Sequence, residues 1–320
     1  MYTFSSELIL RGLTDNLNLN VPLFLVFLFI YISSIVGNTG IIVTIWMDPA
    51  LHTPMYFFVS QLAMLDLFYT SVITPNTLAD INRKIKSISV IDCAIQFVLY
   101  GGSATTESYL LAVMAYDRFV AICQPLQYIM TMSKSICKYL VAAAYSAGYI
   151  NVCIQACFTL RLNYLKDNII DHFYCDILPI IKLTCSDTYL NEVVIFLFGG
   201  FASVICLSTI LFSYINILVT ILRIQSARGR SKAFSTCASH LTCLSIFYGT
   251  VMFTYLRPPS DYMLDNDKLH VNDKIISVFY AVVIPTINPL IYSLRNTEVK
   301  EAVRKIANKY NFFQIFKRSY

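Results

Sequence analysis

The chain has 320 residues, of which 57% are apolar and only 13% are charged, and its formal net charge is +5. A soluble domain carries roughly 25% charged residues, so a soluble fold of this length would expose much apolar surface to water. The composition therefore excludes an ordinary soluble protein and indicates one membrane domain over residues 1–320.

Seven stretches are apolar enough to cross a bilayer as helices, which takes about 20 residues. In chain order they are Val21–Met47, Tyr56–Ala79, Cys93–Ile122, Tyr139–Leu160, Val193–Leu222, Ser235–Leu256 and Ile275–Leu294. The second contains Asp66 and the third contains Glu107, Asp117 and Arg118, whereas the others lack charged residues. The sequence therefore predicts an all-α membrane protein with a seven-transmembrane helix bundle over residues 21–294.

The charges of the connections predict the orientation. With the C-terminus inside the cell, the inner segments hold 14 Lys and Arg and 4 Asp and Glu, whereas the outer segments hold 10 and 13. Basic residues are enriched on the cytoplasmic side of membrane proteins. We therefore expect an extracellular tail over residues 1–20, a cytoplasmic tail over residues 295–320, and a multi-pass protein of the plasma membrane.

Two segments outside the spans have features of their own. The outer connection Arg161–Glu192 has 32 residues, and a loop this long in a compact protein is usually functional. After the last span, apolar residues at helical spacing are interleaved with basic ones, which predicts a short amphipathic helix on the lipid of the inner leaflet. The apolar positions are Val299, Val303, Ile306, Ala307 and Tyr310.

The third and last spans carry the residues expected of a switch. MAYDRFVAIC places Asp117 beside Arg118 at the inner membrane edge, where an unpaired charge is costly. Snorkelling of the arginine to the interface is the alternative interpretation. PTINPLIYSLRN contains a proline kink that frees backbone carbonyls, and its Asn288 and Tyr292 can hydrogen-bond between helices. A kinked half-helix beside an ion pair favours the switch.

Several sequence blocks carry a family resemblance. They are Gly37-Asn38, LHTPMYFF (Leu51–Phe58), MAYDRFVAIC (Met114–Cys123) with Pro125-Leu126, HFYCD (His172–Asp176), Ser213-Tyr214, KAFSTCASHL (Lys232–Leu241) and PTINPLIYSLRN (Pro285–Asn296). With these blocks the chain resembles rhodopsin-like G-protein-coupled receptors and, among them, vertebrate odorant receptors. No single block identifies the family, but the order of the blocks along the chain and their depths in the membrane leave little room for another family.

The resemblance implies an odorant receptor that binds a small, mostly apolar neutral molecule and activates a stimulatory, olfactory-type G protein to raise cyclic AMP. The switch residues that it implies are Asp117, Arg118, Tyr214, Asn288, Pro289 and Tyr292. KAFSTCASHL is then the inner end of the sixth helix, which swings outward to admit the G protein. Phe119 and Gln127 depart from the usual family pattern, but neither removes a charge of the switch, so we expect coupling to survive.

Asp66 and Glu107 form a second constellation, near the middle of their spans. Two carboxylates at bilayer depth repel and are poorly solvated, so one takes up a proton or both share a cation. One interpretation is a neutral acid that ties helices together by hydrogen bonds. The interpretation that we prefer is a sodium site like that of related receptors, with Asn38 and Asn288 nearby.

The cysteines predict a disulfide. Cys93 lies 25 residues before Arg118, which is about 37 Å of helix and places it at the outer surface. The resemblance pairs it with Cys175 in the oxidising environment outside the cell. The family usually adds a second bridge in this loop, but only Cys185 is left and its expected partner position holds Leu165, so we expect a free thiol.

The Asn-x-Ser/Thr sequon usual in the outer tail is also missing.

The ligand site is expected between the outer halves of the third, fifth, sixth and seventh helices. Its candidate residues are Tyr100, Gly101, Ala104, Thr105, Phe198, Ala202, Tyr248, Val251, Met252, Tyr255 and Val278. Each has an alternative interpretation as packing between helices. As a set they are apolar, with hydroxyls but no carboxylate at the level of Tyr100, which favours a neutral volatile ligand over an amine.

Other functions find less support. The sequence has no zinc-protease His pair, glycine-rich phosphate loop or membrane Ser-His-Asp set, so we expect no enzyme, and nothing indicates a nucleic-acid partner. A transporter or channel would show internal repeats or broken helices in matching halves, and an opsin would need a lysine in Ile275–Leu294. A receptor of the same fold that senses a metabolite outside the nose stays open as an alternative.

Overall fold

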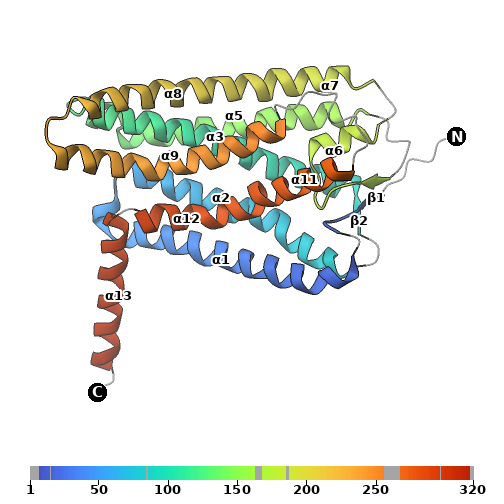
Figure 1. Cartoon of the computed structure of the whole chain (residues 1–320), viewed down its shortest axis with the longest axis horizontal. Coiled ribbons are helices and arrows are strands. Elements are labelled where there is room, and N and C mark those ends of the chain that lie inside the picture. Colours follow the sequence, from blue (N-terminus) through green and yellow to red (C-terminus); the bar gives the residue numbers. More distant parts are fainter. Residues whose placement is uncertain are drawn as a thin grey trace.

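The computed structural model of the chain describes residues 7–14, 16–83, 86–162, 168–184, 187–255, 267–295 and 297–317. Long helices run side by side along one axis, and a small β-sheet lies at one end of the bundle, which we call the sheet end (Figure 1). At the opposite end α13 (Thr297–Lys317) leaves the bundle and runs across its long axis (Figure 1). We call that end the α13 end.

The long helices lie where the apolar stretches predict them. They are α1 (Asn20–Met47), α2 (Pro54–Ile81), α3 (Val90–Cys123), α5 (Lys134–Thr159), α7 (Tyr189–Val194) with the π-helix η3 (Ile195–Gly200) and α8 (Phe201–Leu222), α9 (Ala227–Tyr255), and α11 (Asp267–Val278) with the π-helix η4 (Phe279–Val283) and α12 (Ile284–Arg295). Within the described residues, the connections contain the short helices η1 (Leu17–Leu19), η2 (Pro49–Leu51), α4 (Tyr128–Thr131) and α6 (Ile177–Lys182).

Within the described residues, five helical segments are long and apolar enough to cross a membrane. They are Leu17–Met47, Pro54–Ile81, Lys134–Thr159, Tyr189–Leu222 and Asp273–Tyr292. α9 contributes the shorter apolar stretch His240–Met252. α3 has 34 residues, and it contains the charged residues Asp92, Glu107, Asp117 and Arg118. The fold is therefore that of a mostly helical membrane protein.

Several helices begin earlier than their apolar stretches, and α5 and α9 are two of them. α5 begins at Lys134 rather than at Tyr139, because Ser133 caps it by accepting a hydrogen bond from the N–H of Ile136. α9 begins at Ala227 rather than at Ser235. The predicted starts marked where charged residues cease, whereas a helix continues into water for as long as capping and packing support it.

α3 is the central helix of the bundle and packs against α2, α5 and α8. Its contact with α5 depends on glycines. A Cβ on Gly148 would come within 2.9 Å of the backbone nitrogen of Thr106, and a Cβ on Gly102 would lie 2.7 Å from the Tyr149 ring. Small residues let helix backbones approach closely in membranes, so these glycines fix α5 against α3.

The sheet joins three segments that are far apart in the sequence. β1 (Glu7–Leu10) pairs with β2 (Ser87–Ser89) in antiparallel and with β3 (Ile169–Ile170) in parallel orientation. Its side chains alternate between exposed and buried, and Leu8 and Leu10 pack in one cluster with Cys93 and Cys175. The Sγ atoms of these two cysteines form the disulfide that the resemblance implies. The long connection after α5 is thereby held over the sheet end.

At the other end α13 is attached to the bundle by its first turns. Val299 and Ala302 are almost fully buried there, with exposed fractions of 2% and 1%. Val303, which the sequence pattern placed on the apolar face toward lipid, is 46% exposed. The buried face therefore follows the spacing of Val299 and Ala302, because contact with the bundle selects the face.

Some predictions fall on residues that the structure does not describe. Cys185 and Leu165 lie outside the described residues, and so does the side chain of Tyr255. The free thiol at Cys185 therefore stays a prediction.

The disulfide generates a test of the fold. We expect Cys93→Ser and Cys175→Ser each to prevent delivery to the cell surface, because removing a native disulfide commonly costs about 2–5 kcal/mol. Surface labelling of an epitope-tagged chain measures the effect. Cys153→Ser is the matched control, since Cys153 is an exposed free cysteine on α5. Wild-type surface density of either bridge variant would contradict the expectation.

Candidate functional site

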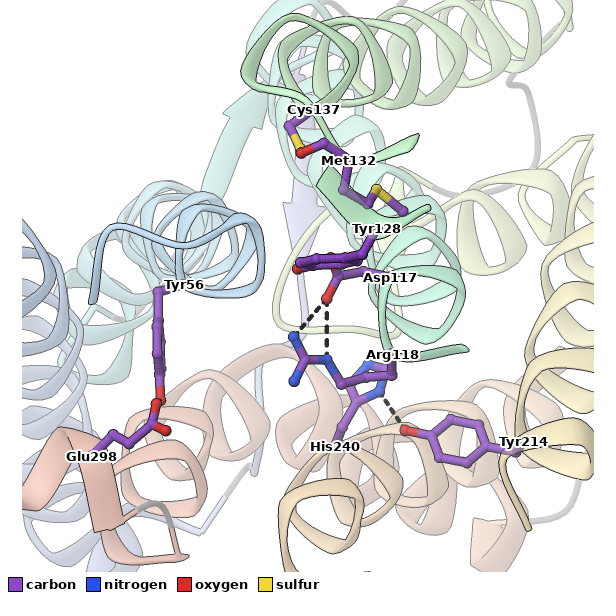
Figure 2. A network of polar contacts seen from close by, with 9 residues as sticks. All are labelled: Tyr56, Asp117, Arg118, Tyr128, Met132, Cys137, Tyr214, His240 and Glu298. Atoms are coloured by element: carbon purple, nitrogen blue, oxygen red, sulfur yellow. Dashed lines mark hydrogen bonds and ion pairs between the residues drawn. The ribbon is translucent and has the colours of Figure 1, made fainter. Parts of the chain in front are cut away.

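The first site lies at the α13 end, where α3 ends in a buried ion pair. Asp117 is completely buried, and its Oδ2 accepts hydrogen bonds from Nη2 of Arg118 at 2.7 Å and from Nε at 3.1 Å. The hydroxyl of Tyr128 on α4 donates to the other carboxylate oxygen at 2.9 Å. The sequence-predicted pair is therefore fully engaged, since a guanidinium and a phenol together satisfy the carboxylate (Figure 2).

A second polar contact joins the helices on the far side of Arg118. The hydroxyl of Tyr214 on α8 lies 2.6 Å from Nδ1 of His240 on α9 (Figure 2). His240 is fully buried, and its Nε2 has no hydrogen-bond partner. A buried polar atom without a partner is costly, which is typical of a site that adopts more than one arrangement. Tyr214 thus bonds to α9 here and not to Arg118.

α13 is tied to the start of α2 by a third contact. The Tyr56 hydroxyl donates to Oε2 of Glu298 at 2.7 Å (Figure 2). Lys305 adds an ion pair to Asp48 at 3.7 Å, but that lysine is well exposed, so the pair contributes little. LHTPMYFF, to which Tyr56 belongs, therefore helps to fix α13 through a buried ring with a polar end.

The proline motif of α12 is completed by α1. Pro289 has no N–H, so the carbonyl of Pro285, four residues earlier, lacks its helical donor. Nδ2 of Asn38 supplies that donor at 2.9 Å. Gly37 allows the approach, because a Cβ at this position would lie 3.2 Å from the Pro289 ring. The pair Gly37-Asn38 and the proline kink thus form one unit, and the buried Tyr292 hydroxyl lies beside Cys243 further along α12.

Midway along the bundle the two predicted carboxylates meet through a tyrosine. The hydroxyl of Tyr69 lies 3.1 Å from Oδ1 of Asp66 and 3.1 Å from Oε2 of Glu107. Nδ2 of Asn288 donates to the other oxygen of Asp66 at 3.0 Å. All four residues are buried. The structure therefore brings α2, α3 and α12 together at one polar cluster, which we call the carboxylate cluster (Asp66, Tyr69, Glu107 and Asn288).

Toward the sheet end the interior is aromatic. Tyr100 on α3 is 1% exposed, and its ring centroid lies 5.0 Å from that of Tyr174, 5.7 Å from that of Tyr280 and 5.9 Å from that of Tyr69. Phe173 packs against Tyr174 in the same cluster. We call these five residues the aromatic cluster. It connects the loop after α5 with α2, α3 and the π-helix η4.

Above this cluster the loop is fixed by polar contacts. The backbone N–H of Cys175 donates to Oε1 of Gln96, and Lys274 of α11 forms an ion pair with Asp171 at 2.6 Å. Burial lowers the pKa of His172 to about 3, and Lys274 acts in the same direction, so this ring stays neutral at physiological pH. Burial raises the pKa of Asp176 to about 6, against a hydrogen bond from the backbone of Ile177. Asp171 of the loop is thus paired with a charged side chain of α11.

The predicted ligand-site residues divide into two neighbouring groups. Tyr100 belongs to the aromatic cluster, and Ala104 and Val278 pack against the larger apolar core that contains this cluster. Tyr248 and Val251 belong to the adjoining core, where the Tyr248 hydroxyl donates to the Ser108 carbonyl at 3.2 Å. The others are more scattered: Ala202 is nearly buried, the Thr105 hydroxyl bonds to its own helix, and Phe198 and Met252 are 41% and 39% exposed.

Gly101 has a different role from the one predicted. A Cβ built on Gly101 would lie 3.2 Å from Cγ1 of Val152 and 3.6 Å from Phe97. The residue therefore faces α5 rather than α9 and α12, although it is adjacent to Tyr100 in sequence. Consecutive helical residues differ by about 100° in direction, so counting turns gave the correct level and the wrong face.

The structure adds residues that the sequence prediction missed. Tyr69 lies three residues after Asp66, a spacing that places two side chains on the same helix face, so its bond to Asp66 could have been found. Its bond to Glu107 depends on how α2 and α3 pack, and no local pattern contains that information. Tyr128 and Tyr174 lie in connections, where periodicity predicts nothing.

Comparison with known proteins agrees with this geometry. The olfactory receptor family profile matches residues 27–309. The chain is 52% identical to human olfactory receptor 5B21 over 304 residues, which cover 95% of this chain and 96% of that protein. It is 50% identical to mouse olfactory receptor 5B21, with 95% and 94% covered, and 48% identical to human olfactory receptor 5B12, with 95% of each covered.

A match over nearly the whole chain shows the family, and it agrees with the order of motifs along the helices. The chain belongs to the olfactory receptor family and is a multi-pass G-protein-coupled receptor, not an enzyme.

Proposed function

We propose that this odorant receptor binds a small, mostly apolar neutral molecule in the half of the bundle nearer the sheet, and that it activates a stimulatory, olfactory-type G protein at the α13 end. The cyclic AMP level then rises. The observation that carries the proposal is a pair of contacts near Arg118 at one end of the bundle. One is the ion pair between Arg118 and Asp117 within α3, and the other is the hydrogen bond between Tyr214 of α8 and His240 of α9.

Seven membrane crossings follow in this proposal. α3 and α9 join the five apolar segments, because the charged side chains Glu107 and Asp117 of α3 are buried and bonded inside the bundle rather than exposed to lipid. The sheet end with its disulfide is extracellular, where disulfides persist. The α13 end is cytoplasmic, and α13 lies on the inner leaflet with Lys300, Arg304 and Lys305 exposed toward anionic lipid.

The switch is proposed to act through exchange of partners. In the state described here Arg118 is bonded to Asp117, and Tyr214 is bonded to His240. Outward movement of α9 would break the Tyr214–His240 contact and open the space beside Arg118 to the G protein. Tyr292 would move inward on the kinked α12.

The nature of the ligand follows from what surrounds Tyr100. The aromatic cluster contains hydroxyl groups and rings but no carboxylate or ammonium group. Aromatic rings and hydroxyls bind apolar molecules that carry a hydrogen-bonding group. We include Ala104, Thr105, Phe198, Ala202, Tyr248, Val251, Met252, Tyr255 and Val278 with Tyr100 as candidate contacts, and we leave Gly101 out.

A sodium ion at the carboxylate cluster is a further part of the proposal. Carboxylate, phenol and amide oxygens are the ligands that hard cations prefer, and Oδ1 of Asn38 is buried without a hydrogen-bond partner one turn from the Asn288 level. Asp66 and Glu107 would hold the ion, and its charge would offset their repulsion.

Replacement of Arg118 tests the coupling. We expect Arg118→Ala to reduce odorant-evoked cyclic AMP to background while the receptor stays detectable at the surface, because the guanidinium is the charged group of the switch. A reporter assay in cells that express the chain, screened with odorants, measures this. Arg83→Ala is the matched control, as Arg83 is exposed at the sheet end. Full signalling by Arg118→Ala would contradict the assignment.

Replacement of sodium tests the cation site. If the closed bundle supplies more oxygen ligands than the open one, sodium favours the inactive state. We therefore expect basal cyclic AMP production in membranes to fall when potassium is replaced by sodium at constant ionic strength. Asp66→Asn should abolish this dependence. Wild-type basal activity that is insensitive to sodium would count against the site.

A further inference from the structure

Tyr69 is the one residue of the aromatic cluster that also belongs to the carboxylate cluster. Its ring is 2% exposed and meets Tyr100 edge to face, with an interplanar angle of 78°. Its hydroxyl lies between Asp66 and Glu107. The two ends of this side chain thus touch the proposed ligand region and the polar middle of the bundle.

The hydroxyl cannot serve both acids in the same way. A phenol carries one proton, so it donates to one carboxyl group and either accepts from the other or gives it no hydrogen bond. Both distances are 3.1 Å, so the oxygen is equally near to the two acids. Since one acid is on α2 and the other on α3, the position of this oxygen fixes how closely the two helices can approach at that level.

On the other side the ring is confined by contacts that reach the loop. Tyr100 is in ring contact with Tyr69, Tyr174 and Tyr280, and the hydroxyl oxygens of Tyr174 and Tyr100 are 3.5 Å apart. Protein interiors are close-packed, so a molecule that enters beside Tyr100 must displace a ring. The edge of Tyr69 lies directly behind that ring.

We propose that Tyr69 is the positioning residue through which a ligand at Tyr100 acts on Asp66, Glu107 and Asn288. Displacement of Tyr100 shifts the Tyr69 ring and withdraws its hydroxyl from the two acids. Asp66 then rearranges, and with it the bond to Asn288 that holds α12 beside α2. This inference rests on the proposed function in one respect, namely that the ligand lies against Tyr100.

Tyr69→Phe tests the proposal, because it removes the hydroxyl and keeps the ring. The readout is alkylation by N-ethylmaleimide of Cys237, which is 2% exposed on α9, one turn from His240. Opening of the α13 end exposes this thiol whether or not a G protein is present. We expect labelling about five- to tenfold faster than in the wild type, the population shift produced by losing one buried hydrogen bond.

The matched control is Tyr149→Phe. Tyr149 on α5 also bonds to α3 through its hydroxyl, at 2.9 Å from Oγ of Ser103, but it belongs to neither cluster. The same chemical change there should leave Cys237 labelling at the wild-type rate. Equal acceleration by both variants would mean that any hydroxyl bonded to α3 has this effect, which would overturn the assignment to Tyr69.

A second variant tests the contact between Tyr69 and Glu107. Removing one partner leaves a buried group unsatisfied, whereas replacing both partners by apolar groups is nearly neutral. Tyr69→Phe combined with Glu107→Met should therefore return labelling toward the wild-type rate. If Tyr69→Phe alone fails to reach the surface, the same double variant should restore delivery. Absence of rescue in either measurement would overturn the proposal.

A third variant tests the contact between Tyr69 and Tyr100. Tyr100→Leu removes the ring behind which Tyr69 lies, and it should accelerate labelling too. If Tyr100 acts through Tyr69, the accelerations of labelling caused by Tyr69→Phe and Tyr100→Leu do not multiply when the two changes are combined, whereas independent effects do. Multiplying effects would overturn the coupling through Tyr69. If the labelling results hold and no odorant raises cyclic AMP, the G-protein proposal fails and this inference stands.

Discussion

The burial of two acids at the middle of an apolar bundle is the constraint around which the other contacts are arranged. A carboxyl group at this depth needs donors, and Asp66 and Glu107 obtain them from a tyrosine on α2 and an asparagine on α12. These donors tie α12 to α2 and α3, although Asn288 and Asp66 are 222 positions apart in the sequence. The aromatic contacts on one side and the ion pair on the other share α3 with these acids.

The proline in α12 poses the same problem in the backbone. A missing N–H leaves a carbonyl inside the bundle without a donor, and Asn38 of α1 provides one. A fourth helix, α1, is thereby attached to α12 by a hydrogen bond that exists only because Pro289 removes a helical donor. The π-helix η3 shows a similar solution, since Nδ2 of Asn151 on α5 donates to the carbonyl of Phe198. Irregular backbone is tolerated wherever a neighbouring side chain completes it.

The sequence predicts most of what depends on local composition and much less of what depends on packing. The apolar stretches place the long helices, the family resemblance pairs Cys93 with Cys175, and the adjacency of Asp117 and Arg118 predicts their contact. The direction of Gly101 and the exposure of Val303 depend on helix rotation, which hydropathy does not specify. The pairing of β1 with β3 joins residues about 160 positions apart, so no local pattern contains it.

The two halves of the bundle differ in the kind of interaction that they use. This difference explains why a tyrosine, Tyr69, lies at their boundary. Toward the sheet, contacts between rings depend on shape and respond to a neutral molecule of suitable size. Toward α13, contacts between charges and hydroxyls depend on direction and change by exchange of partners. A signal that passes from one half to the other must be converted from displacement into hydrogen bonding. Phenylalanine offers only a ring and serine only a hydroxyl, whereas Tyr69 carries both on one rigid side chain.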